Sequence, residues 1–147
     1  MAGPDVEICE AEHGSSLYAE ALKLRYEVLR KPLGLTYSDE QIAAEKGETH
    51  LVAVIGGQVV GSLSLVWECD HVRLRQMAVG PDCQGTRLGR TLLTKAEELA
   101  SLRGRDRAEL HARMSALGFY QKAGYAAVSG EYVEVGLPHR TMSKALG

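Results

Sequence analysis

A change of phase within one apolar strand constrains the fold of this chain more than any other feature. Val72 and Leu74 alternate as on one face of a strand, whereas the next apolar pair, Met77 and Val79, falls on the opposite phase. One extra residue just before Met77 restores the alternation, which is what a β-bulge does. We therefore predict a bulged strand over residues 71–79.

A turn and a helix follow this strand. Pro81 ends the strand, because it has no N–H to give to a ladder. Apolar residues then recur at helical spacing and predict a helix over 87–103, with the stripe Leu88, Leu92, Ala96 and Leu99. We expect the free N–H groups at its start, from Thr86 to Arg90, to form an anion site of the kind that phosphate usually occupies.

The turn itself carries a family resemblance. No Gly-Lys pair precedes Ser or Thr, and Gly85 and Gly89 are four residues apart, so two other phosphate-loop patterns fail. What remains is Gln84 to Arg90, QGTRLGR, which resembles the pyrophosphate loop Q/R-x-x-G-x-G/A of the GNAT superfamily of acetyl-CoA-dependent N-acetyltransferases. Arg87 stands where that family usually has its middle glycine, and we expect its guanidinium to add a phosphate contact.

A second segment supports the resemblance. Residues 112–125, ARMSALGFYQKAGY, are similar to the family's A-x-x-F-Y-x-x-x-G-F/Y segment, with Ala116, Phe119, Tyr120, Gly124 and Tyr125 aligned. The pattern predicts a short helix over 113–122, ended by Gly124. The closing segment 134–142 resembles the last strands of small bacterial members, so the resemblance covers about residues 24–146.

The order of the predicted elements indicates an α+β fold in a single domain over 1–147. We expect a mixed, mostly antiparallel sheet of six to seven strands, flanked by about four helices. The remaining strands are predicted at 6–10, 49–55, 58–67, 107–111, 125–135 and 139–145, and the remaining helices at 16–30 and 38–46. The first helix has the apolar stripe Leu17, Ala21, Leu24 and Val28. The GNAT resemblance implies that strands 72–79 and 107–111 splay at the bulge and admit the cofactor between them.

Bulk composition excludes several classes of protein. The net charge of −2 argues against general nucleic-acid binding. Three widely spaced cysteines, Cys9, Cys69 and Cys83, argue against a disulfide framework or a zinc site and favour a reducing cytoplasm. The sequence has neither a signal-peptide pattern nor a membrane-spanning apolar run. We expect a cytoplasmic protein with no metal, nucleic-acid partner or membrane partner. Many small GNAT proteins dimerise through their last strands, so the resemblance leaves a homodimer as one possible oligomeric state.

The resemblance implies acetyl-CoA as the co-substrate. The expected cofactor-binding residues are Met77, Ala78, Val79, Gln84, Gly85, Thr86, Arg87, Leu88, Gly89 and Arg90. Backbone N–H groups freed by the bulge are assigned to the pantetheine arm and the thioester carbonyl, an oxyanion-hole role worth about 3 kcal/mol. Tyr120 is the candidate general acid, because a phenol with an ordinary pKa near 10 is close to the thiol being formed.

The acceptor side carries two further candidates. Glu134 and His139 flank the Gly136-Leu137-Pro138 turn, which we expect to lie over the open end of the gap between the two splayed strands. There a carboxylate attracts a cationic amine, and a neutral histidine takes its proton. His111 and Glu48 are alternatives, as is relay of the proton by water.

The implied activity is acetyl transfer to a small-molecule or peptide amine by direct attack in a ternary complex. One alternative is a GNAT fold that binds CoA as a sensor or partner without catalysis; Arg87 favours it and Tyr120 opposes it. Another is an acyltransferase with a longer acyl donor, which rests on the helical segment 24–28. The sequence does not identify the acceptor.

Overall fold

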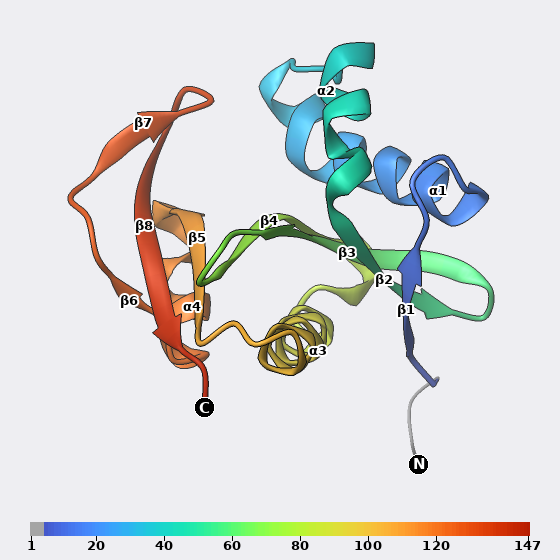
Figure 1. The fold of residues 1–147 in the computed structure, drawn as a ribbon. Helices are drawn as coiled ribbons and strands as arrows, with labels where there is room; N and C mark the ends of the chain where they lie inside the picture. The colour runs from blue at the N-terminus through green and yellow to red at the C-terminus, as the bar shows by residue number, and fades with distance from the viewer. Residues whose placement is uncertain (1–4) are drawn as a thin grey trace.

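The computed structural model describes residues 5–147, which fold around one mixed sheet of eight strands (Figure 1). The strands are β1 (Glu7–Ala11), β2 (Thr49–Ile55), β3 (Gln58–Trp67), β4 (Val72–Val79), β5 (Arg107–Arg113), β6 (Ala126–Ala127), β7 (Tyr132–Glu134) and β8 (Leu137–Ala145). Their order is β1-β2-β3-β4-β5-β8-β6, with β7 also paired to β8. β4 and β5 pair in parallel, and the other pairs are antiparallel.

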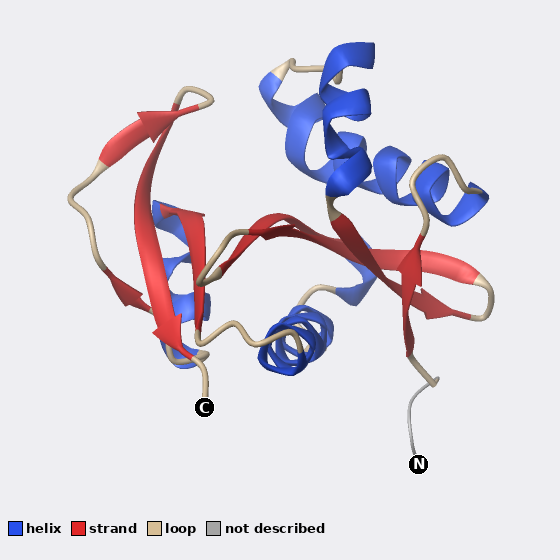
Figure 2. Cartoon of the chain, in the orientation of Figure 1, coloured by secondary structure: helices blue, strands red, loops and turns tan. Residues whose placement is uncertain are grey.

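Helices cover both faces of this sheet (Figure 2). They are α1 (Ser16–Arg25), α2 (Asp39–Ala44), α3 (Leu88–Leu102) and α4 (Leu117–Lys122). Short helical turns follow or precede them: η1 (Tyr26–Arg30), η2 (Lys31–Leu33), η3 (Glu45–Gly47), η4 (Pro81–Cys83) and η5 (Met114–Ala116). α1 and α2 lie on one face and α3 on the other (Figure 1). Within residues 5–147, no helix is long and apolar enough to span a membrane.

The mixed, mostly antiparallel sheet is confirmed, but it has eight strands rather than six or seven. The difference arises in the segment predicted as one strand, 125–135, which forms the separate strands β6 and β7. Between them the Ser129 hydroxyl accepts the Thr141 N–H of β8. A side chain thus takes a backbone donor that a continuous ladder would use, and the pairing is interrupted.

The main core lies between α3 and the sheet. The buried face of α3, Leu88, Leu92, Leu93, Ala96 and Ala100, packs on Leu63, Leu65, Leu74 and Leu110 of the central strands. The helical stripe predicted from the sequence is therefore the buried one, apart from Leu99, which is only partly buried. The predicted hairpin also forms, and its turn residues Gly56 and Gly57 both have positive φ, as a tight two-residue turn requires.

The first helix departs from its prediction. It ends at Arg25, and a π-helical turn, η1, replaces its last five predicted residues. Its buried residues are Tyr18, Ala21 and Arg25, so Ala21 is the one member of the predicted apolar stripe that is buried. Leu17, Leu24 and Val28 of that stripe are only half-buried. The Tyr18 hydroxyl and the Arg25 guanidinium can face inward because the buried carboxylate of Glu45 accepts their hydrogen bonds.

Candidate active site

A cleft opens where β4 and β5 separate. Their parallel pairing covers only three residues and ends at Leu74 opposite Leu110, so the remainder of each strand has a free edge. The cleft has a volume of about 1540 Å³ and is lined by β4, the start of α3, the end of β5, α4, η1 and the β7–β8 turn. This is the splay that the family resemblance implies between these two strands.

The β-bulge predicted in β4 is present. Ser62 of β3 pairs with Ala78, whereas Ser64 pairs with Arg75, so β4 has one more residue than β3 across this interval. Gln76 and Met77 are the two β4 residues within this interval, and Gln76 has a φ of +58°. Met77 and Val79 line the cleft, while the Ala78 side chain is 1% exposed and does not line it.

The start of α3 offers backbone donors to one end of the cleft. The first N–H bonded along this helix is that of Thr91, which donates to the Arg87 carbonyl. The N–H groups of Leu88, Gly89 and Arg90 therefore point out of the helix end. Thr86 was expected to contribute as well, but its N–H donates to the Cys83 carbonyl and it does not line the cleft.

Three contacts hold this turn in place. The Gln84 side chain donates to the Val79 carbonyl at 3.2 Å, which ties the turn to β4. Arg90 Nη1 donates to the Lys122 carbonyl at 3.1 Å, which ties α3 to the end of α4. A Cβ on Gly89 would lie 3.3 Å from Cζ of Phe119, so glycine lets the phenyl ring pack on the helix. Gly85, with φ +82° and open space around it, lets an anion approach the backbone.

Arg87 occupies the N-cap position of α3 with φ +68°, a left-handed conformation that favours glycine. We predict that Arg87→Gly stabilises the fold by about 0.5–1 kcal/mol, because relief of roughly 1–2 kcal/mol of strain exceeds the roughly 0.5–1 kcal/mol entropy cost of glycine. The same change should weaken acetyl-CoA binding by removing a cation. Thermal melting and isothermal titration measure the two effects. Tighter acetyl-CoA binding by the glycine variant would show that the arginine obstructs the phosphates.

Tyr120 lies on the wall of the cleft at α4. Its ring contacts those of Phe119 and Tyr125, at centroid distances of 5.0 and 5.9 Å. Burial raises the pKa of Tyr120 to about 12. The phenol therefore keeps its proton throughout the physiological range and can act only as a donor or as a neutral acceptor there.

The predicted acceptor-side residues meet at the opposite wall. Glu134 Oε1 lies 2.9 Å from His111 Nδ1, and Glu134 Oε2 lies 3.6 Å from His139 Nε2. All three residues line the cleft. His139 Nδ1 lies 2.8 Å from the Leu137 carbonyl, which can only accept, so this nitrogen carries a proton. The same reasoning assigns the Nδ1 proton of His111 to its bond with the Glu134 carboxylate, and leaves His111 Nε2 as the basic atom.

The turn that presents Glu134 differs from its prediction. Glu134 pairs with Leu137, so the two turn residues are Val135 and Gly136, and Leu137 and Pro138 belong to β8. Both turn residues have positive φ, +47° and +78°. A tight two-residue hairpin requires this geometry, which keeps Glu134 directly across from the start of β8.

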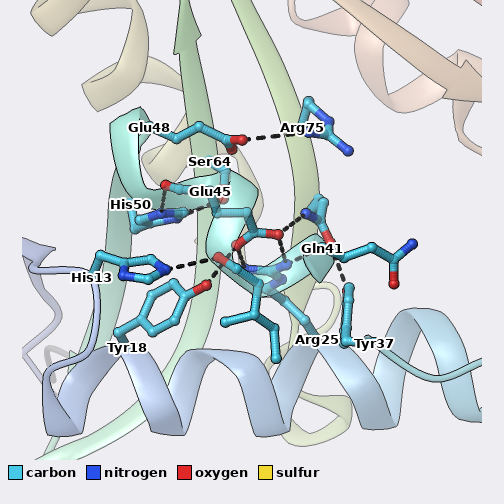
Figure 3. A network of polar contacts seen from close by, with 12 residues as sticks. His13, Tyr18, Arg25, Tyr37, Gln41, Glu45, Glu48, His50, Ser64 and Arg75 are labelled. Carbon is cyan, nitrogen blue, oxygen red and sulfur yellow. Dashed lines mark hydrogen bonds and ion pairs between the residues drawn. The ribbon is translucent and has the colours of Figure 1, made fainter. Parts of the chain in front are cut away.

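A buried polar network supports the bulge from the side of α1 (Figure 3). Glu45 accepts two bonds from Arg25, at 2.9 and 2.6 Å, and one from Tyr18 at 2.8 Å. Gln76, the bulge residue, donates to Glu45 at 2.9 Å and accepts from Arg25 at 2.8 Å and from Tyr37 at 2.6 Å. Sequence reasoning missed this network, although Tyr18, Ala21 and Arg25 have helical spacing.

The charges of this network are tightly compensated. Burial alone would raise the pKa of Glu45, but its bonds from Arg25 and Tyr18 lower it to about 2. Arg25 is 1% exposed and Glu45 3%. Removal of one partner from such a buried pair typically costs about 3–5 kcal/mol. The bulge conformation is thus fixed by a rigid support.

Glu48, an alternative acceptor-side carboxylate in the sequence, does not line the cleft. It lies at the C-cap of η3, 3.5 Å from Arg75 (Figure 3). Burial raises the pKa of Glu48, and Arg75 partly offsets this. In the part of the chain that the structure describes, no three His, Cys, Asp or Glu side chains are grouped as a metal site would need.

Comparisons with known proteins agree on one family. A family model described as an acetyltransferase (GNAT) domain matches residues 25–146. The uncharacterized N-acetyltransferase YjcF of Bacillus subtilis (strain 168) is 26% identical over 126 residues, 85% of this chain and 90% of that protein. Another relative from the same strain, the uncharacterized protein YyaT, is 28% identical over 131 residues, 86% of this chain and 88% of that protein.

Solved structures show the same fold. The crystal structure of a protein from Lactobacillus plantarum, assigned as an N-acetyltransferase, has a TM-score of 0.87 at 28% identity and covers 97% of this chain and 99% of that one. A GNAT family acetyltransferase from Elizabethkingia anophelis with acetyl-CoA bound has a TM-score of 0.73 at 17% identity, over 96% of this chain and 98% of that one. The fold class predicted from the sequence is confirmed.

Proposed function

Because the chain belongs to the GNAT acetyltransferase family, we propose that it transfers an acetyl group from acetyl-CoA to an amine by direct attack within a ternary complex. The observation that carries this proposal is one continuous cleft. It joins the N–H groups at the start of α3, the free edge of bulged β4, Tyr120, and the His111–Glu134 pair. A site for an anion and a base for an amine thus open into the same space.

The residues at the α3 end suit the pyrophosphate of acetyl-CoA. The N–H groups of Leu88, Gly89 and Arg90 converge on the helix end, where the helix dipole adds about half a positive charge. Gly85 leaves the approach open, and the side chains of Arg87 and Arg90 line the same end. The free edge of β4 at Met77 and Val79 supplies further backbone donors along the cleft.

Acetyl-CoA, when bound, supplies a thioester carbonyl to the amine. In our proposal His111 Nε2 accepts the amine proton, and Glu134 holds the Nδ1 proton and so fixes the tautomer and the ring orientation. N–H groups at the bulge stabilise negative charge on the carbonyl oxygen. Tyr120 donates its proton to the departing sulfur, and the phenolate recovers a proton from solvent. The raised pKa of about 12 keeps the phenol protonated at neutral pH but removes the close match to the thiol that an ordinary phenol would have.

Isothermal titration with acetyl-CoA, followed by a thiol-release assay over a panel of amines, tests the proposal. We expect a saturable binding isotherm and amine-dependent release of free CoA. Binding without thiol release for any amine would overturn the proposal in favour of a CoA-binding module.

The His111–Glu134 pair predicts a specific pattern of rates. We expect His111→Gln to lower kcat by about 100-fold or more, as loss of a general base does, and Glu134→Gln to lower it by about tenfold or more. Because Glu134 acts through His111, the double variant should be no slower than His111→Gln alone. Steady-state kinetics of the three variants with the best amine provide the measurement. Multiplicative losses would instead show that Glu134 contacts the amine itself.

A further inference from the structure

The acceptor half of the cleft is strongly basic, although the chain has a net charge of −2. Four arginines of the cleft lie outside the α3 end: Arg73 and Arg75 of β4 before the bulge, Arg113 at the end of β5, and Arg30 of η1. The one carboxylate that lines the cleft is Glu134, and it is bonded to His111. The anionic side chains that give the chain its net charge thus lie outside the cleft.

The strand register brings these arginines onto one face. Arg73 pairs with Glu109 in the parallel β4–β5 ladder, so alternate residues Arg73 and Arg75 share a face with Glu109, His111 and Arg113. The Glu109 carboxylate is engaged by Arg107 at 2.8 Å. Leu74 and Leu110 point the opposite way, into the α3 core. Arg30 reaches the same space from η1, on the side of the sheet that α1 and α2 cover (Figure 1).

Three of the four guanidinium groups form no close ion pair with any carboxylate of the described residues. Arg75 lies 3.5 Å from Glu48. Arg113 donates to the Leu29 carbonyl at 3.3 Å, and Arg30 stacks 4.5 Å from the centre of the Tyr37 ring. Across residues 5–147, no carboxylate lies within 4.0 Å of a guanidinium nitrogen of Arg30, Arg73 or Arg113. These side chains are only half-exposed, so water compensates their charge incompletely.

The phosphates of acetyl-CoA do not account for this group. The pyrophosphate site proposed at α3 follows Val79, and Arg73 precedes Val79 by six residues of the bulged strand, a separation of up to roughly 20 Å. Arg87 and Arg90 are already available at the α3 end. The cleft therefore has a second concentration of positive charge, beside the base that would receive the amine.

We propose that the acceptor amine carries an anionic group, a carboxylate or a phosphate, which the Arg30, Arg73 and Arg113 side chains bind while His111 faces the amine. This inference rests on the proposed function and names the substrate class of its site. Guanidinium groups bind carboxylate and phosphate through paired, charge-assisted hydrogen bonds. A concave cleft of one charge also concentrates ligands of the opposite charge. It adds an anionic group to the cationic amine that Glu134 was expected to attract.

Matched pairs of ligands test the inference without requiring turnover. With CoA present at saturation, we compare titration of N-acetylglycine with N-acetylglycinamide, and of N-acetyl-O-phosphoethanolamine with N-acetylethanolamine. In the pair whose anionic group matches that of the acceptor, the charged member should bind about tenfold or more tightly. The two pairs distinguish a carboxylate from a phosphate. Equal affinity within both pairs overturns the inference, whether or not the protein acetylates any amine.

Variants connect the preference to the arginines. Arg73→Gln should lower the charged-to-neutral affinity ratio at least about fivefold. Arg73→Lys should lower it less, because the charge remains although the paired N–H donors are lost. Arg103→Gln, a matched loss of charge at the C-cap of α3 outside the cleft, should leave the ratio unchanged. The acetyl-CoA dissociation constant should stay the same in Arg73→Gln. If that constant rises and the ratio does not fall, the arginines serve the cofactor and the inference is wrong.

The same ligand pairs extend to catalysis. We compare kcat/KM for glycine with that for glycinamide, and kcat/KM for O-phosphoethanolamine with that for ethanolamine. The preferred anionic amine should have a higher kcat/KM than its neutral partner. Absence of thiol release for every amine, together with the binding preference above, would refute the proposed function and leave the anion site standing. Turnover with no preference for the anionic amine, together with equal binding, would refute the anion site and leave the proposed function standing.

Discussion

Gly89→Glu is expected to abolish measurable acetyl-CoA binding, with an increase in the dissociation constant of about 100-fold or more. Gly89 lies in the first turn of α3, between the N–H groups that suit the pyrophosphate and the ring of Phe119. A glutamate there adds a negative charge against the phosphates and removes the advantage of the helix dipole. A hundredfold change corresponds to about 2.7 kcal/mol. Isothermal titration with acetyl-CoA is the measurement.

Two controls separate binding from folding. Gly130→Glu adds the same charge at an exposed position with open space around its Cβ and should bind acetyl-CoA as the wild type does. Gly89→Ala brings a methyl group 3.3 Å from Phe119 Cζ without any charge, so it reports the packing effect alone. If folded Gly89→Glu, judged by its melting transition, binds acetyl-CoA with unchanged affinity, the phosphate site does not lie at the start of α3.

Tyr120→Phe is expected to lower turnover by about ten- to a thousandfold, as loss of a proton donor does, with unchanged acetyl-CoA affinity. The substitution removes only the hydroxyl, so the ring contacts with Phe119 and Tyr125 remain. Because the pKa of Tyr120 is raised to about 12, the wild-type phenol stays protonated at neutral pH. Deprotonation of the Tyr120 phenol should therefore lower activity only at strongly alkaline pH.

Tyr125→Phe is the matched control for this result. The Tyr125 hydroxyl donates to Glu97 at 2.8 Å and does not line the cleft. Its loss should lower stability without a comparable loss of turnover. Wild-type kcat in Tyr120→Phe with the best amine would mean that the phenol is structural, and that sulfur takes its proton from solvent.

The cofactor half of the cleft could be predicted from the sequence because its signals are local. The phase change at Met77 encodes the bulge, and the register between Ser62 and Ser64 confirms it. The apolar spacing after Arg87 encodes α3, whose observed bounds differ from the prediction by one residue at each end. Backbone geometry decides both features, and neither depends on distant side chains.

The acceptor half could not be predicted as well, because long-range contacts decide it. Glu134 and His139 were placed together by their closeness in sequence, but the 2.9 Å contact with His111 joins residues 23 apart. The inward face of α1 was assigned to apolar residues, since a helical pattern gives no sign that Glu45 will receive Arg25. The arginines of β4 and β5 become neighbours only through the parallel pairing of the two strands.

Initial-rate kinetics with acetyl-CoA and the amine varied together test the central claim, that the acetyl group passes directly between two substrates held in one cleft. The account predicts intersecting double-reciprocal lines and no acetyl group on the protein after quenching with acetyl-CoA alone. Cys83 lines the same cleft and offers the one cysteine sulfur among its described lining residues. Parallel lines together with acetylated protein in the mass spectrum would contradict the account, because the acetyl group would then reside on the chain between two separate half-reactions.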